Sequence, residues 1–198
     1  LDRPTSMVFR SDHGFIFNFF LSTHAGENMS ETKLHILALA VSLRRDSINR
    51  KLLYAASQCS PANLRISIYD ELGELPMFNE DLEVDGGPLA VKNLRDAVRR
   101  ADAVMLATPE YNHSMSGVLK NALDWLSRPD PDEVLAGKPV LAMGASTGPW
   151  GTRLAQAALR QVLFSNQALL MPKPALHLRS AQSLFDSNGD LCDEATRE

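Results

Sequence analysis

The stretch TPEYNHSMSGVLKNALDW, residues 108–125, decides the fold of this chain. It follows an apolar run at residues 101–107, which is typical of a strand buried on both faces. Pro109 ends this strand because proline has no N–H to donate to a sheet ladder. Beyond a polar loop, Ser116 begins a helix whose apolar side chains recur at helical spacing, at Val118, Leu119, Ala122, Leu123 and Leu126. This strand, loop and helix place polar groups at the carboxyl end of a strand, where open α/β sheets bind their ligands.

The rest of the chain repeats this alternation of apolar strands and amphipathic helices. Strands are predicted at residues 34–41, 64–69, 103–108, 139–145 and 168–171. Helices are predicted at residues 48–57, 89–100, 116–126 and 152–164. Residues 70–88 and 129–132 are rich in turn formers, and are predicted to be a long loop and a turn. The order of these elements predicts an α/β fold with a parallel sheet and right-handed crossovers.

Length and composition suit one globular domain. A chain of 198 residues can bury a substantial core, and its 44% hydrophobic and 22% charged residues are typical of globular proteins. The net charge of -4 argues against non-specific nucleic-acid binding, which needs a basic surface. Cys59 and Cys192 have neither CxxC nor metal-binding spacing and favour a reducing compartment, so we expect a cytoplasmic protein. No apolar run is long enough to span a membrane.

The first 28 residues differ from the rest of the chain. The segment FIFNFFL, residues 15–21, is apolar but short, and no clear small-residue cleavage pattern follows it. A degenerate signal peptide is therefore the less favoured interpretation. We expect residues 1–28 to be an extension outside the fold, and residues 29–198 to form the domain.

The loop after the first strand, SLRRDSIN at residues 42–49, is suited to bind an anion. Ser47 is the predicted N-cap of the helix that follows, and a helix N-terminus offers unpaired N–H groups and a partial positive charge that match a phosphate. Ser42, Ser47 and Asn49 add neutral donors, and Arg44 adds a charged one. The loop lacks the glycines of a dinucleotide fingerprint or a Walker loop, which argues against those sites. A capped helix with solvated arginines is the plainer alternative.

The second loop, residues 109–112, offers backbone N–H and C=O groups that can pair with the polar edge of a flat heterocycle. Tyr111 can lie beside the ring, and Asn112 can fix the loop. We expect the side chain of Glu110 to face solvent or a subunit contact rather than to act as a general acid. We expect His113 to be an exposed loop histidine rather than a proton donor.

The third loop, GASTGPWG at residues 144–151, also leads into a helix. It differs from the G-x-S-x-G of a nucleophile elbow because Gly148 comes one place late. Since His113 is the one histidine in the three loops, a Ser-His-Asp triad has little support. Trp150 can cap a site here or take part in a dimer contact.

The block PEYNHSMSGVLKNALDWLSRP, residues 109–129, closely resembles the signature of the NAD(P)H-dependent FMN reductases, and the resemblance extends from about residue 34 to about residue 194. That family comprises flavodoxin-like flavoproteins, among them quinone, azo-dye and chromate reductases. The resemblance implies a three-layer flavodoxin-like sandwich with five parallel strands in the order 2-1-3-4-5. It also implies a homodimer or homotetramer whose contacts involve the helices after Ser116 and Gly151. Because family members continue beyond the segment at residues 185–194 into a full last helix, we expect that helix to be truncated here.

The resemblance assigns FMN to the three loops. Residues 42–49 resemble the family's GSLRxxSxN phosphate loop, although Val41 stands where the family usually has glycine. The third loop would direct backbone N–H groups toward the pyrimidine end of the flavin, where negative charge grows on reduction. The predicted FMN-binding residues are Ser42, Leu43, Arg44, Ser47, Ile48, Asn49, Pro109, Glu110, Tyr111, Asn112, Ser146, Thr147 and Gly148.

The implied reaction passes a hydride from NADPH or NADH through bound FMN to a small acceptor such as a quinone, an azo compound, a free flavin or an oxidised metal ion. Such a transfer needs no acid or base side chain if donor and flavin are held in contact, so we expect no catalytic residue. Two alternatives stay open. One is a flavodoxin-like electron carrier to a protein partner, although flavodoxins are usually far more acidic than -4. The other is a flavin-binding protein without turnover.

Overall fold

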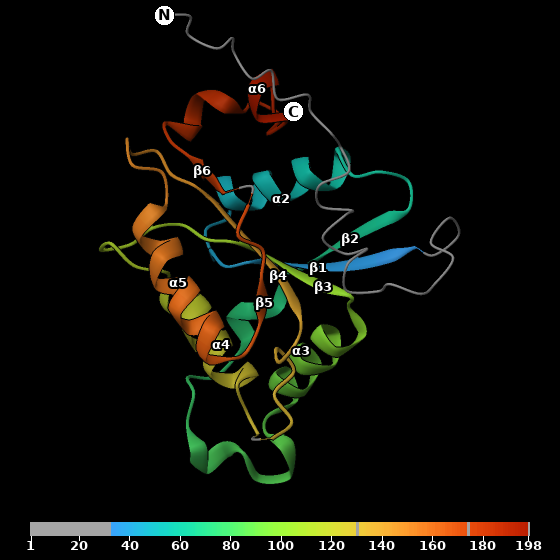
Figure 1. Ribbon diagram of the computed structural model, residues 1–198. Helices are drawn as coiled ribbons and strands as arrows, with labels where there is room; N and C mark the ends of the chain where they lie inside the picture. Colours follow the sequence, from blue (N-terminus) through green and yellow to red (C-terminus); the bar gives the residue numbers. More distant parts are fainter. Residues whose placement is uncertain (1–32, 130, 174, 198) are drawn as a thin grey trace, which may run out of the picture.

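A parallel sheet forms the centre of the computed structural model, which describes residues 33–129, 131–173 and 175–197 (Figure 1). The strands are β1 (Leu34–Ala40), β2 (Leu64–Tyr69), β3 (Ala103–Ala107), β4 (Pro139–Ala145), β5 (Leu169–Leu170) and β6 (Leu176–Leu178). They lie in the order β2-β1-β3-β4-β5, and β6 also pairs with β4. The predicted α/β class and strand order are therefore confirmed. The prediction for residues 1–28 falls outside the described residues.

β5 and β6 share one border of β4. Pro139 and Val140 pair with β5, whereas the last three residues of β4 pair with β6. The sequence predicts one short strand at residues 168–171 and no strand at β6. The reason is that Leu176–Leu178 has only three residues, too few for an alternating pattern to be recognised.

Helices cover both faces of the sheet (Figure 1). α2 (Ile48–Gln58) lies on one face, and α3 (Leu89–Arg100), α4 (Gly117–Leu126) and α5 (Arg153–Ser165) lie on the other. Strand side chains alternate between the two cores, as the pleat requires. In β3, for example, Val104 and Leu106 join the core under α3, α4 and α5, whereas Met105 and Ala107 join the core under α2. Burial on both faces explains why the central strands are continuous apolar runs.

The long loop predicted at residues 70–88 contains three short 3₁₀ turns, at Glu71–Glu74, Glu80–Leu82 and Val84–Gly86. Leu72 and Leu75 enter the core from this segment. It thus covers part of α3 and α4 instead of extending into solvent.

Trp125 of α4 packs against the same segment. Its side chain is 1% exposed, its Nε1–H donates to the carbonyl of Pro76 at 2.8 Å, and its ring meets Phe78 edge-on. Asn121 fixes the segment as well, since it accepts from the Phe78 N–H and donates to the Pro76 carbonyl. The many apolar residues of α4 are therefore buried within the chain and need no subunit contact to cover them.

The C-terminal segment packs on the α2 face. A 3₁₀ turn at Ala181–Leu184 brings Ala181 and Leu184 to that core, and α6 (Glu194–Arg197) is a single short turn. Among the helices that the structure describes, none is long and apolar enough to cross a bilayer.

The carboxyl ends of the three central strands coincide. Ala40 of β1 pairs with Ala107 of β3, which in turn pairs with Met143 of β4. The loops that follow these strands therefore emerge side by side at one edge of the sheet.

Candidate functional site

A small hollow of about 110 Å³ lies where the three loops meet. Its lining consists of Ser42, Arg44, Ser47, Ile48, Asn49, Pro109, Glu110, Tyr111, Ala145, Ser146 and Thr147. The structure thus brings together residues predicted from all three loops. Leu43, Asn112 and Gly148 are predicted site residues that do not line this hollow, although each is next to a residue that does.

The first loop ends in an open helix N-terminus. The Ser47 side chain caps α2 by accepting from the Arg50 N–H at 3.3 Å. The N–H groups of Ile48 and Asn49 make no hydrogen bond with any described residue, and the first turn of α2 contains no acidic residue. With Arg44 beside it, this end of the hollow fits a phosphate.

The acidic residue of this loop is directed away from the hollow. Asp46 pairs with Lys51 at 2.6 Å, and its side chain is largely exposed. The hydrogen bond and then the charge of Lys51 lower the pKa of Asp46. The anion site is therefore not opposed by a carboxylate from its own loop.

Asn49 has a different part in the site from the one predicted. Its side-chain amide donates to the carbonyl of Ala145 at 3.0 Å and accepts from the Ala145 N–H at 2.8 Å. It is therefore a positioning residue that ties the start of α2 to the end of β4. The sequence predicts that this amide donates to a phosphate. In the structure, the amide N–H that is bonded to Ala145 makes a contact within the chain instead.

Ser116 makes a similar tie between the first two loops. Its hydroxyl donates to the carbonyl of Val41 at 2.7 Å and accepts from the Leu119 N–H. It therefore caps α4 and joins the start of this helix to the residue that follows β1. Val41 itself is fully buried. The residue that replaces the family's glycine is thus accommodated in the core.

Glu110 corrects one prediction. Its side chain is 12% exposed, and its Oε2 accepts from the N–H groups of Leu154 at 2.9 Å and Ala155 at 3.1 Å. The expectation that this carboxylate faces solvent or a subunit contact is wrong. α5 has neither a side-chain cap from Thr152 nor an acidic residue in its first turn, so its first N–H groups need an acceptor from elsewhere in the chain. Glu110 supplies that cap from 44 residues away, where no local pattern in the sequence can indicate it.

The second loop is a tight hairpin. Tyr111 and Ser114 exchange backbone hydrogen bonds, and the two residues between them, Asn112 and His113, have φ values of 49° and 61°. Tyr111 is half-exposed and lines the hollow. His113 has a side chain that is 82% exposed and does not line it, in agreement with the expectation of an exposed loop histidine.

The third loop has fewer available donors than the sequence suggests. The Ser146 N–H donates to the carbonyl of Leu178 in β6, and the Gly148 N–H donates to Ser146 Oγ. Of the three N–H groups predicted to face a flavin, that of Thr147 alone has no hydrogen bond with the described residues. The bond of Ser146 follows from β6, whose pairing with β4 continues into this loop, whereas that of Gly148 is made within the loop.

Comparisons with known proteins identify the family. The profile of the NADPH-dependent FMN reductases matches residues 34–183. An NAD(P)H-dependent FMN reductase of Pseudomonas aeruginosa is 44% identical over 165 residues, which cover 83% of this chain and 88% of that protein. A 2-hydroxy-1,4-benzoquinone reductase of a Burkholderia species is 39% identical, with 83% of this chain and 89% of that protein covered.

A solved structure gives the same result. The flavoenzyme NAD(P)H:(acceptor) oxidoreductase of Paracoccus denitrificans superposes with a TM-score of 0.76 at 34% identity, and the match covers 82% of this chain and 88% of that one. From the sequence match and the structural match together, this chain belongs to the NADPH-dependent FMN reductase family.

Proposed function

We propose that this protein reduces quinones and related small acceptors with electrons that it takes from NAD(P)H through FMN. As a member of the family it is an oxidoreductase with FMN as cofactor and NAD(P)H as electron donor. The observation that carries the proposal is the hollow itself, which has the open N-terminus of α2 on one side and the second and third loops on the other. The relative named for a benzoquinone supports quinones as the acceptor class. Azo compounds, free flavins and oxidised metal ions are further candidates.

The phosphate of FMN would lie at the start of α2. Ile48 and Asn49 offer backbone N–H groups, Ser42 and Ser47 offer hydroxyls, and Arg44 offers a charge-assisted contact. Ser42 and Ser47 line the hollow and are 8% and 4% exposed. This donor set favours FMN over riboflavin, which lacks the phosphate.

The flavin ring would lie between the second and third loops. Glu110 lines the hollow, and its side chain is bound to α5. Its backbone N–H and C=O make no hydrogen bond with the described residues. Thr147, whose N–H makes no hydrogen bond with the described residues, lines the same hollow from the other loop. When bound, FMN supplies the hydride chemistry, and these groups would orient its ring and stabilise negative charge on it.

The residues around the hollow fit a reaction without a protein acid or nucleophile. The lining contains no histidine, cysteine or lysine among the described residues, and its one carboxylate, Glu110, serves as the cap of α5. For such a reaction, the chain has only to hold the electron donor in contact with the flavin. We therefore assign no catalytic residue.

We also propose that the protein works as a homodimer or homotetramer in the cytoplasm. α5 presents Leu154 and Phe164 to solvent, with exposed fractions of 48% and 86%, and these positions suit a contact with a second copy. Light scattering at micromolar concentration tests the assembly, and a monomer would contradict it.

The first experiment is a titration of the apoprotein with FMN and with riboflavin. We expect stoichiometric uptake of FMN and weaker binding of riboflavin by calorimetry. Equal affinity for the two would contradict the role given to residues 42–49.

The second experiment separates the enzyme from the electron carrier and from a protein that only binds flavin. NADPH or NADH is added without oxygen to the FMN-loaded protein, and the flavin absorbance is followed before and after a quinone is added. The proposed enzyme loses the absorbance with the donor and regains it with the quinone. Flavin that keeps its absorbance with both donors would favour one of the two alternatives.

A further inference from the structure

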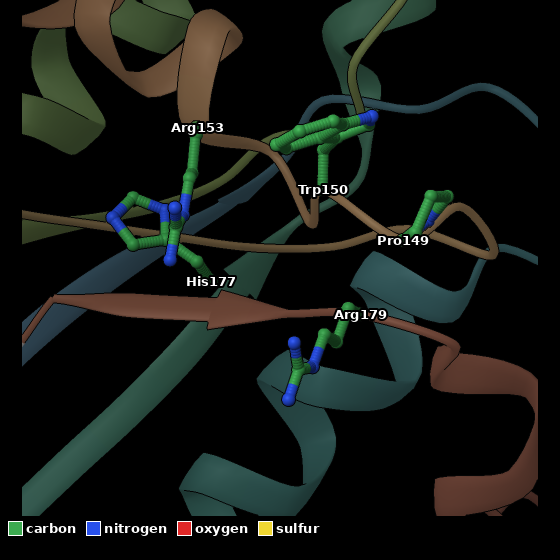
Figure 2. Close-up of a pocket in the computed structure, with 5 residues that line it drawn as sticks. All are labelled: Pro149, Trp150, Arg153, His177 and Arg179. Carbon is green, nitrogen blue, oxygen red and sulfur yellow. The ribbon is translucent and has the colours of Figure 1, made fainter.

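A second hollow, of about 250 Å³, adjoins the loop at residues 146–151. It is lined by Pro149, Trp150, Arg153, His177 and Arg179 (Figure 2), none of which is assigned above to FMN. Figure 2 shows Arg153 at the start of α5 extending toward His177 of β6, with the indole of Trp150 to the right of both, above the loop that carries it. Because Leu176 and Leu178 join the core under α2, His177 points to the opposite face, on the side of α5.

Two arginines in the lining have no ion-pair partner among the described residues. Neither Arg153 nor Arg179 forms an ion pair with any residue that the structure describes. Arg153 is also the first residue of α5, where the helix dipole makes a cation unfavourable. The stability of the helix therefore does not explain its position.

The positive charge of nearby arginines also affects His177. Burial, followed by the charges of Arg153 and Arg160, lowers the pKa of this imidazole below its ordinary value of 6.5. Its Nδ1 is buried and has no hydrogen-bond partner within the described residues. A buried nitrogen without a partner, beside two arginines that form no ion pair with the described residues, indicates a place for a group that brings negative charge and hydrogen-bonding atoms.

One loop connects this hollow to the flavin site. Ser146 and Thr147 line the first hollow, and Pro149 and Trp150 line the second. Gly151, with φ of 65°, lies so close to β6 that a Cβ there would be 2.8 Å from the carbonyl oxygen of His177. The loop is thus pressed against β6, and this keeps the two hollows next to each other.

We propose that the second hollow binds the 2′-phosphate and the adenine of NADPH, and that Arg153 and Arg179 thereby select NADPH over NADH. This inference rests on the proposed function, because it takes NAD(P)H as the donor at the adjacent flavin. The two donors differ only in that phosphate, whose charge at neutral pH is about −1.5 to −2 if it ionises as other phosphate monoesters do. Guanidinium groups match phosphate oxygens in geometry and charge. The Trp150 indole, 70% exposed, offers a face on which a purine can stack.

The kinetic test compares the two donors on the FMN-loaded enzyme. In the double variant Arg153→Gln, Arg179→Gln, we expect the KM for NADPH to rise about ten- to a hundredfold, because charge-assisted contacts with a phosphate are lost. The KM for NADH and the kcat with either donor should stay at the wild-type values. Arg100→Gln is the matched control, since Arg100 is an exposed arginine at the end of α3, at the opposite edge of the sheet, and it should change neither KM.

The binding test does not depend on turnover. 2′,5′-ADP, which carries the additional phosphate, and 5′-AMP, which lacks it, are titrated separately into the FMN-loaded protein by calorimetry. The wild type should bind 2′,5′-ADP more tightly, and the double variant should bind the two nucleotides equally.

Two results would overturn the assignment. If the KM for NADPH is unchanged in the double variant, the hollow does not bind this phosphate. If both KM values rise equally, it contacts a part that the two donors share, such as the pyrophosphate. A protein that oxidises neither donor contradicts the proposed function instead, and the nucleotide titration still decides whether the hollow binds the phosphate.

Discussion

Asn49 and Ala145 exchange two hydrogen bonds across 96 residues of sequence. Both are almost fully buried, with 4% and 2% of their surfaces exposed. The pair joins the start of α2, where a phosphate would bind, to the end of β4, where the loop beside the flavin ring begins. In addition to the strand pairing of the sheet, this side-chain amide therefore fixes the relative position of the two halves of the site.

Replacing Asn49 with alanine should weaken both the fold and the site. The substitution leaves the N–H and the C=O of Ala145 buried without their partner, at about 1–3 kcal/mol for each unpaired group. We expect a lower free energy of unfolding in urea, and weaker FMN binding by calorimetry. Asn93→Ala is the control, because Asn93 is exposed on α3. An unchanged urea midpoint for Asn49→Ala would show that the pair is not structurally important.

Glu110 should matter for stability and not for proton transfer. Glu110→Ala removes the cap of α5 and should lower the free energy of unfolding by about 0.5–2 kcal/mol. Glu110→Gln keeps an acceptor oxygen and should lose less. Both variants should retain most of the wild-type kcat when saturated with FMN. A large loss of kcat in Glu110→Gln with no change in thermal unfolding would instead identify the carboxylate as an acid or base.

Arg44 and Arg45 should differ although they are adjacent. Arg44 lines the hollow and Arg45 does not, so Arg44→Ala should weaken FMN binding about ten- to a hundredfold through the loss of a charge-assisted contact. Arg45→Ala should have little effect, which makes it the internal control. Equal losses in the two variants, measured by titration of the apoproteins, would mean that the loop is arranged differently.

The kinetics should be ping-pong, with parallel lines in double-reciprocal plots of NAD(P)H against a quinone. One open face of the flavin ring cannot hold donor and acceptor together, so they should bind in turn. His113→Ala should keep its turnover within about tenfold of the wild type, whereas a positioned proton donor would contribute about 10²–10⁴. Intersecting lines, or a loss of about three orders of magnitude in His113→Ala, would contradict these expectations.

His177 should make stability depend on pH. Burial and the nearby arginines lower its pKa in the folded state, so between that lowered pKa and 6.5 the unfolded chain binds more protons than the folded one. The contribution of His177 to stability is therefore complete above 6.5 and is lost as the pH falls. Between about pH 7.5 and about pH 5, His177→Gln should lose less unfolding free energy than the wild type.

The sequence predicts the sheet well because burial on both faces leaves a strong local signal. The apolar runs of β1, β3 and β4 and the helical spacing of α3 and α4 are all visible in short windows. Once the strand order is known, the three loops must meet at one edge, and most of the predicted residues do line one hollow.

The missed features depend on contacts between distant parts of the chain. Nothing near Glu110 indicates that α5 lacks a cap, and nothing near Asn49 indicates that its amide holds Ala145. Leu176–Leu178 becomes a strand because the end of β4 offers a free border, and this pairing occupies the Ser146 N–H. Local pattern thus predicts where the polar groups gather, but not which of them are already engaged.

The two-part border of β4 also affects how the folded protein meets other copies of itself. β5 contributes two residues and β6 three, so neither presents a long row of unpaired backbone groups to an incoming strand. The opposite border is β2, which has six residues and carries the exposed Arg65. Strand addition and the aggregation that follows from it are thus disfavoured at one border by short strands, and at the other by a charged side chain on the edge.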